Sequence, residues 1–456
     1  MASGLRGILN ASFEFVARLQ RAGHTITYAC PHDVGNYVRA QGISYRQLPP
    51  VNFSPAPPTP AVDPDFAGIR TRLEKWRTAA TRREQGVQAL RMDEFINFLD
   101  ETRPDLILID SELYEHIFAI HQTDYPIALI TPWFSKWKAR GLPPLQSDII
   151  PGRGLRGSRA GLEFEWLSAR LSRWLSVKKT SLRCAFTERR AVLRQYADAV
   201  SFPLETLEQF SWVTLFNDNR LPTLSLTAKE LDFPHHPPNH FYYTGPMVSL
   251  SRKETDVSDA DNERLQKVFS ERKKNHRPLI YCWLTTMDDR GGEFIERVVA
   301  AVSPRSDWLL LLGHGGSPVK ALDDLPANVY KFDYVPQIEV MQNADLCITL
   351  GGINTINESL TCGVPLLVYP TGSADQKGCA ARVAFHGLGY LGDISKDAPA
   401  DIARKIEMTL KDRKIRDRVS HMRETLDGYR RQRTAEGIVD KLLECSRSSR
   451  SFHSAR

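Results

Sequence analysis

Short apolar runs recur along this chain of 456 residues, and segments with helical periodicity separate them. The runs are apolar at nearly every position, as in Asp105–Asp110 (DLILID), Pro126–Thr131 (PIALIT) and Trp308–Leu312. A strand without polar alternation is buried on both faces, which is typical of a parallel sheet covered by helices. The pattern therefore predicts an α/β fold with two Rossmann-like, doubly wound domains that face each other.

The chain length and the positions of proline predict where these domains begin and end. We expect a first domain over residues 1–233, a linker rich in proline and histidine over 234–250, and a second domain over 251–445 whose last helix packs back on the first. A Ser/Arg tail over 446–456 is expected to be disordered. An open α/β domain normally begins with a strand, but this chain begins at a turn before a helix that Asn10 would cap. The first strand is therefore either missing or encoded upstream of the given start.

The composition is that of a soluble globular protein, with 42% hydrophobic and 25% charged residues. No apolar run is long enough to cross a bilayer, and the N-terminus lacks the apolar core of a signal peptide. The seven cysteines are scattered without close pairs, which indicates buried thiols in a reducing cytoplasm rather than disulfides or a metal site. The net charge of +6 suits anionic small ligands or loose membrane contact, and it gives little support to nucleic acid as a partner.

One apolar strand leads into a glycine pair. Leu346–Thr349 is followed, after one further residue, by Gly351 and Gly352 and then by a segment with a helical pattern. The polar side chains expected on the first turns of that helix are Asn354, Thr355 and Glu358. Glycines let the backbone approach a ligand, and a helix N-terminus presents unpaired N–H groups with partial positive charge. The stretch therefore predicts a phosphate-binding site.

The sequence from Asp333 to Gln376 resembles the nucleotide-sugar signature of the UDP-dependent glycosyltransferases with the two-domain GT-B fold. It is most similar to the bacterial branch that includes macrolide and carotenoid glycosyltransferases. The resemblance extends from about Asn10 to about Glu444, and it is strong in the second domain and weak in the first. It implies that a hexose is transferred, with inversion, from a nucleotide sugar to a hydroxyl of a hydrophobic small-molecule or lipid acceptor.

The resemblance gives a donor-binding role to residues of the second domain, which are Thr286, Tyr334, Gln337, Gly351, Gly352, Asn354, Thr355, Glu358, Asp375 and Gln376. In the family, the aromatic residue at the position of Tyr334 stacks on uracil. The Asn and Thr meet the diphosphate, the Glu takes both ribose hydroxyls, and the Asp-Gln pair reads the sugar. The resemblance thus implies a UDP- or TDP-sugar as donor substrate, with no further cofactor and no metal ion.

Two histidines of the family's pattern are replaced in this chain. Ile8 stands where the family has the histidine that removes a proton from the acceptor hydroxyl, and isoleucine cannot accept a proton. Leu350 stands where the family has a histidine that contacts the diphosphate, so that hydrogen bond is lost. The family's supporting aspartate is retained as Asp110, which we expect to face Ile8 and to act as a base with a raised pKa. Asp110 could instead only cap the helix that follows it.

The acceptor is expected in the first domain, near Ile8, Asn10 and a proline-rich loop. His116 could replace the missing base, or it could simply be a surface or core histidine. Leu162–Val177 carries aromatic and basic residues at helical spacing. This helix could dock on a membrane, line an apolar acceptor pocket, or pack on its own domain.

Two other functions stay open at this stage. The protein could have lost sugar transfer and catalyse another step on a natural-product scaffold, such as a cyclisation, or it could be a non-catalytic partner of another enzyme. The replaced histidines favour these alternatives, whereas the retained Glu358, Asp375 and Gln376 favour the transferase. The sequence specifies neither the sugar, nor the acceptor, nor the oligomeric state.

Overall fold

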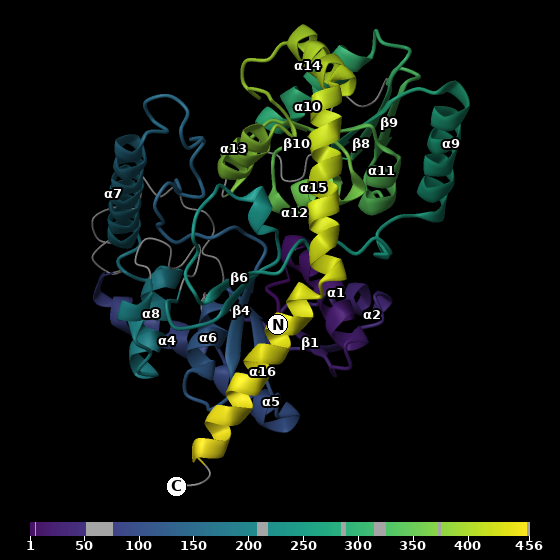
Figure 1. The fold of residues 1–456 in the computed structure, drawn as a ribbon. Coiled ribbons are helices and arrows are strands. Elements are labelled where there is room, and N and C mark those ends of the chain that lie inside the picture. The colour runs from purple at the N-terminus through teal and green to yellow at the C-terminus, as the bar shows by residue number, and fades with distance from the viewer. Residues whose placement is uncertain are drawn as a thin grey trace.

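The computed structural model describes residues 1–4, 6–51, 76–207, 218–283, 289–313, 325–372 and 375–453. Two α/β units face each other, and two consecutive C-terminal helices run along both of them (Figure 1). Every strand pairing between named strands is parallel. These observations confirm the predicted α/β fold class.

The first unit contains two small sheets. In one, β1 (Thr27–Cys30) pairs with β2 (Ser44–Gln47), and in the other the order is β3 (Ile107–Asp110), β4 (Ile127–Thr131), β5 (Thr223–Ser225), β6 (Phe241–Tyr243). The α-helices of this unit are α1 (Arg6–Arg21), α2 (Gly35–Ala40), α4 (Ala79–Gln88), α5 (Met92–Thr102), α6 (Tyr114–Ile120), α7 (Arg159–Arg183) and α8 (Arg189–Ala199). The strands read as continuous apolar runs because helices cover both faces of the larger sheet.

The second unit is built on one six-stranded sheet. Its strand order is β12 (Gly389–Leu391), β11 (Leu366–Val368), β10 (Leu346–Thr349), β7 (Leu279–Trp283), β8 (Leu309–Gly313), β9 (Val329–Phe332). Its helices are α9 (Asp259–Asn275), α10 (Asp289–Val302), α11 (Gln337–Asn343), α12 (Ile353–Cys362), α13 (Gln376–His386) and α14 (Pro399–Lys411). The order reverses between β10 and β7, and parallel sheets bind ligands beyond the carboxyl ends of strands at such a point.

The last two helices connect the units. α15 (Arg413–Arg431) packs beside α12 in the second unit, and α16 (Thr434–His453) crosses to the first unit (Figure 1). Ala435 and Val439 of α16 belong to the same apolar cluster as Leu9 and Val16 of α1. The first and last helices therefore pack in the same apolar core.

Three local expectations are wrong. The predicted linker over 234–250 contains β6, which pairs in the four-stranded sheet of the first unit because Phe241 and Tyr243 are buried in the core. The chain therefore crosses to the second unit after this strand. Asn10 lies inside α1 rather than at its N-cap, since that helix begins at Arg6. α16 continues to His453 through the expected tail, where no glycine or proline interrupts it.

The expected gap in the first sheet is real within the described residues. No full strand joins β1 to β3, and the sheet is divided there. The first two residues lie in this gap: the Met1 ammonium donates to Leu108 O at 2.6 Å, and Asp110 N–H donates to Met1 O at 2.9 Å. On the other side, Ala2 N–H donates to Ala29 O at 3.2 Å.

Candidate active site

The glycine pair forms the expected turn between β10 and α12. Gly351 has φ +91°, and a Cβ there would lie 2.8 Å from Val368 Cγ1, so both the backbone and the space require glycine. Gly352 is the N-cap of α12. The first N–H of the helix, that of Ile353, donates to Asp375 Oδ2 at 3.2 Å. One N–H donor of the predicted anion site, that of Ile353, is thus already bonded to the Asp375 carboxyl.

Asp375 lies at the centre of this turn. It is the N-cap of α13, it is buried, and its Oδ2 also accepts from Cys379 Sγ at 3.3 Å. Burial raises the pKa of Asp375, while the hydrogen bonds that it accepts lower it. One of those bonds comes from the side chain of Trp133, which follows β4 of the first unit. Asp375 therefore lies where the two units meet. The sequence around Asp375 does not predict its contact with Trp133.

The N-terminus of α12 faces the N-terminus of α1. A Cβ on Gly7 would lie 2.8 Å from Asn354 Nδ2, so a larger residue here would require the Asn354 side chain to shift. The next residue, Ile8, is only 5% exposed and packs in the apolar cluster of α1. Leu350 is 7% exposed and packs in the apolar cluster of the second sheet. The Ile8 and Leu350 side chains are therefore part of the apolar cores, which fits their apolar character.

Glu358 is held by two donors. Arg252 Nη1 donates to its Oε1 at 2.5 Å, and Gln337 Nε2 donates to its Oε2. The Arg252 and Glu358 side chains are 1% and 5% exposed. Although burial opposes it, the neighbouring Glu358 and Glu254 carboxylates raise the pKa of Arg252 above its usual value. The side chain predicted to bind ribose is thus held in place by a buried cation.

This pair belongs to a polar network that crosses between the units. Arg252 Nε donates to Glu254 Oε1 at 2.8 Å, and the Tyr37 hydroxyl contacts Glu254 Oε2 at 3.1 Å and Asn10 Oδ1 at 2.8 Å. Asn10 therefore belongs to the network and not to a helix cap. Sequence reasoning missed Tyr37, Arg252 and Glu254, because no motif links them and only the fold brings them together.

The remaining donor residues lie near these groups. Tyr334 precedes α11 and is 41% exposed, so its ring is accessible to a planar ligand. Thr355 lies in the first turn of α12 and is partly exposed. Gln376 begins α13, and its Oε1 accepts from Thr371 N at 3.0 Å and Thr371 Oγ1 at 2.7 Å. Thr286 lies outside the described residues.

Asp110 is enclosed at the carboxyl end of β3. It is 1% exposed, its Oδ2 accepts from Ser3 N–H at 3.2 Å and its Oδ1 accepts from Glu112 N–H at 3.1 Å. Burial raises the pKa of Asp110. Because backbone donors already satisfy both oxygens, this carboxyl mainly organises the turn after β3.

Two neighbours of Asp110 have shifted pKa values. Burial and the Asp110 carboxylate raise the pKa of the partly exposed Glu112 to about 7. Burial lowers the pKa of Lys136 to about 8, against the attraction of Glu112 and Asp110. The Lys136 ammonium lies 4.9 Å from the centroid of the Trp133 ring. A carboxyl that titrates near neutral pH is suited to general-base catalysis.

His116 lies on the far side of this turn. Its ring is fully buried in α6, it packs edge-to-face on Phe95 at 4.8 Å between centroids, and Nδ1 is 3.5 Å from Glu115 Oε1. These contacts place the His116 ring in the core between α5 and α6, where it has no exposed surface.

α7 is largely uncovered. Of its 25 residues, only Leu162, Trp166 and Ser181 are buried. The exposed large apolar side chains are Phe164, Leu167, Leu171, Trp174, Leu175 and Leu182. Within the described ranges, no helix is long and apolar enough to cross a membrane, and no group of three or more His, Cys, Asp or Glu is placed to hold a metal ion.

Residues 314–443 match the profile of the erythromycin biosynthesis protein CIII-like C-terminal domain. The chain is 24% identical over 414 residues to the oleandomycin glycosyltransferase of Streptomyces antibioticus, with 89% of this chain and 81% of that protein covered. It is 27% identical over 237 residues to the NDP-glycosyltransferase YjiC of Bacillus subtilis, and it spans about half of that relative, 55%.

Solved structures show the same fold. The glycosyltransferase of kitacinnamycin has a TM-score of 0.62 at 21% identity, with 98% of this chain and 97% of that chain covered. The glycosyltransferase VinC in complex with dTDP has a TM-score of 0.62 at 16% identity, with 98% of both chains covered. This chain therefore has the GT-B fold of these glycosyltransferases.

The region that matches the profile contains every predicted donor residue except Thr286. Ile8, Asp110 and Glu112 lie in the first unit, outside the matched region. The signature is therefore concentrated in the second unit, as the sequence indicated.

Proposed function

We propose that the protein transfers a hexose from a UDP- or TDP-sugar to a hydroxyl of a hydrophobic acceptor, with inversion. One observation carries the proposal: the predicted donor residues of α11, α12 and α13 gather around one helix N-terminus that faces α1 of the other unit. Helix N-termini stabilise anions, and a leaving diphosphate carries the charge that develops during transfer.

The donor would occupy this edge in an extended form. The Tyr334 ring offers a stacking surface for the base, and Glu358 offers its remaining lone pairs to ribose hydroxyls. The diphosphate would meet the N-terminus of α12 near Asn354. Asp375 now accepts from Ile353 N–H, so it must release this donor if the diphosphate takes it. Released, Asp375 would be able to accept from a sugar hydroxyl, as the family's pattern implies.

The reaction needs a group that accepts the proton of the acceptor hydroxyl, and Ile8 stands where the family pattern has that group. Asp110 is the residue that the sequence suggests, but its oxygens are enclosed and paired. Glu112 is two residues further, is partly exposed, and has its pKa raised to about 7. We therefore assign the role of proton acceptor to Glu112, whose pKa is raised by burial and by the neighbouring Asp110.

We infer a hydrophobic acceptor from the apolar side chains of α1 and α7. Ile8 removes a polar group from the first turn of α1, and α7 exposes an aromatic and aliphatic face with Arg170, Arg173 and Lys178 along it. A helix of this composition suits contact with a lipid surface. A lipid or another hydrophobic alcohol is thus the proposed acceptor, with peripheral membrane contact during transfer.

The direct test is a transfer assay with UDP-glucose or TDP-glucose and a panel of hydrophobic alcohols and phenols, followed by mass spectrometry. A product heavier by one hexose is expected, and its anomeric configuration should be inverted relative to the donor. If nucleotide binds but neither transfer nor donor hydrolysis occurs, the protein is instead a GT-B member without sugar transfer. The buried, apolar Ile8 and Leu350 favour that second candidate, which would act on or bind a natural-product scaffold.

A further inference from the structure

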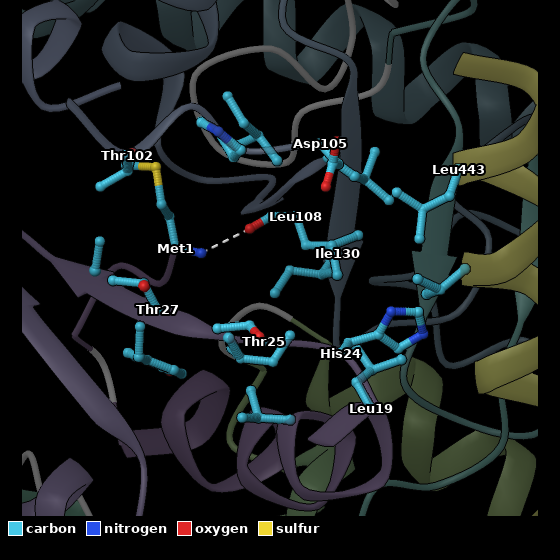
Figure 2. A pocket seen from close by; sticks show the side chains of 18 of the residues that line it. Met1, Leu19, His24, Thr25, Thr27, Thr102, Asp105, Leu108, Ile130 and Leu443 are labelled. Atoms are coloured by element: carbon cyan, nitrogen blue, oxygen red, sulfur yellow. Dashed lines mark hydrogen bonds between the residues drawn. The ribbon is translucent and has the colours of Figure 1, made fainter. Parts of the chain in front are cut away.

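Two cavities of the first unit differ in their lining. The one between β1 and β3, of about 500 Å³, is lined mainly by apolar side chains such as Leu19, Ile130 and Leu443 (Figure 2). The other, of about 700 Å³, lies between α7 and the start of α8. The charged residues that line this second cavity, all within the described ranges, are Arg170, Arg173, Lys178, Glu188, Arg190 and Arg194. Five cations and one carboxyl around a cavity indicate an anionic ligand.

The second cavity lies at the N-terminus of α8. The N-cap residue Glu188 and two residues of the first turn, Arg190 and Ala191, line it. The Glu188 side chain accepts from Ser181 Oγ at 2.6 Å, and within the described residues it makes no capping bond to α8. The first turn contains two cations, Arg189 and Arg190, and no acidic residue. Because a helix N-terminus is already partly positive, cations there are unfavourable, and a bound anion would offset this cost.

The cationic side chains of the cavity are close enough to repel one another. Burial lowers the pKa of Arg190, the charges of Arg194 and Arg173 lower it further, and the Glu188 carboxylate raises it. Arg190 and Arg194 are four residues apart on α8, a spacing at which like charges destabilise a helix. The cluster therefore reduces stability in the free protein, and an anion bound between these groups would relieve the repulsion.

An apolar stripe of α7 borders the cavity, and α7 lies at the periphery of the molecule (Figure 1). Successive residues of a helix are about 100° apart, so Arg170, Trp174 and Val177 share the side of α7 that lines the cavity. About a quarter of a turn away lies a stripe of exposed apolar residues, which are Phe164, Leu167, Leu171, Leu175 and Leu182. Trp174 joins the two, because it lines the cavity and is 57% exposed. A ligand with one anionic group and an apolar chain can therefore contact both.

We propose that this cavity binds the phosphate group of an anionic lipid whose chains lie on the apolar stripe of α7. Guanidinium groups donate paired, charge-assisted hydrogen bonds to phosphate oxygens, and Arg190 and Arg194 place two guanidiniums at one end of the cavity. Free phosphate could enter the cavity, but it would leave the apolar stripe in water. The inference rests on the proposed contact of α7 with a lipid surface and names the ligand of that contact.

Vesicle binding by the full chain, without nucleotide, tests this proposal. Two vesicle types are matched in zeta potential: phosphatidylcholine with phosphatidic acid, and phosphatidylcholine with oleate, which is anionic but has no phosphate. The wild type should bind the phosphatidic acid vesicles at least about 10-fold more tightly. The double variant Arg190→Gln/Arg194→Gln should lose this preference. The matched control Lys179→Gln/Arg183→Gln removes two charges of α7 outside the cavity, so it should weaken binding to both vesicle types equally and keep the preference.

The cavity variant should unfold at the same temperature as the wild type or at a higher one, because it relieves the repulsion between Arg190 and Arg194. This measurement, made without lipid, separates loss of phosphate recognition from loss of fold. Calorimetry with a soluble short-chain phosphatidic acid and with inorganic phosphate then separates the two sources of the anion. The short-chain lipid should bind more tightly, since its chains also contact α7.

Three results would overturn the proposal. Equal affinity of the wild type for the two vesicle types, or a preference that the cavity variant retains, would leave only diffuse charge and apolar contact on α7. Inorganic phosphate that binds as tightly as the short-chain lipid would assign the cavity to free phosphate. Absence of binding to either vesicle type would also remove α7 from membrane contact. None of these measurements involves nucleotide or sugar transfer, so failure here is distinguishable from failure of the proposed transferase.

Discussion

Replacing Arg252 by methionine tests whether the network between the units is organised by a buried cation. The Arg252 and Glu358 side chains are 1% and 5% exposed, so solvent screens their attraction little. Removing one partner of such a pair leaves an uncompensated buried charge and costs about 3–5 kcal/mol in the free energy of unfolding. An exposed ion pair, Arg404 with Asp401 at 3.3 Å, should cost under about 1 kcal/mol when Arg404→Met removes it.

The assay is urea denaturation of four proteins: wild type, Arg252→Met, Glu358→Gln and the double variant. Because the glutamine at 358 no longer carries a charge, the double variant should cost at least about 1 kcal/mol less than the sum of the single variants. Arg252→Met should also weaken UDP binding, since Glu358 loses a buried donor that holds its carboxyl in place. Additive costs, or a cost for Arg252→Met as small as that for Arg404→Met, would refute the reasoning.

Three further outcomes are expected. Glu112→Gln should lower kcat by about 10²–10⁴ and abolish a rate profile that otherwise rises through pH about 7 as Glu112 loses its proton, while unchanged kinetics would exclude it as the base. Gly351→Ala should destabilise the protein by about 1–3 kcal/mol in chemical denaturation, whereas Gly437→Ala, in open space on α16, should be neutral or stabilising. Trp174→Glu should reduce sedimentation with anionic vesicles without altering the unfolding midpoint, and equal sedimentation would remove α7 from membrane contact.

The second unit was predictable because its signature is contiguous. The stretch from Asp333 to Gln376 contains two strands, the glycine turn and the starts of three helices, so the local pattern alone specified most of the elements at this edge of the sheet. The pattern could not predict the hydrogen-bond partners of these side chains. Nothing local indicates that Glu358 is paired with Arg252, 106 positions earlier, or that Asp375 caps α12.

The first unit was less predictable for physical reasons. Its linker prediction relied on proline and histidine content, and β6 formed there because Phe241 and Tyr243 are buried on the sheet, where tertiary packing outweighs local preference. Asp110 was correctly placed at the end of its strand, but its enclosure by Ser3 and Glu112 N–H groups depends on the N-terminal residues folding back beside it. A strand-end position alone does not distinguish an enclosed carboxyl from an accessible one.

The central claim is that the edge formed by α11, α12 and α13 binds a nucleotide diphosphate. Isothermal titration of the wild-type chain with UDP, TDP and UDP-glucose tests it most directly, with Glu358→Gln as the variant that should bind the nucleotide more weakly. The account predicts saturable binding of at least one nucleotide with a Kd below about 1 mM, equivalent to about −4 kcal/mol. No heat of binding from any of the three at millimolar concentration would contradict it.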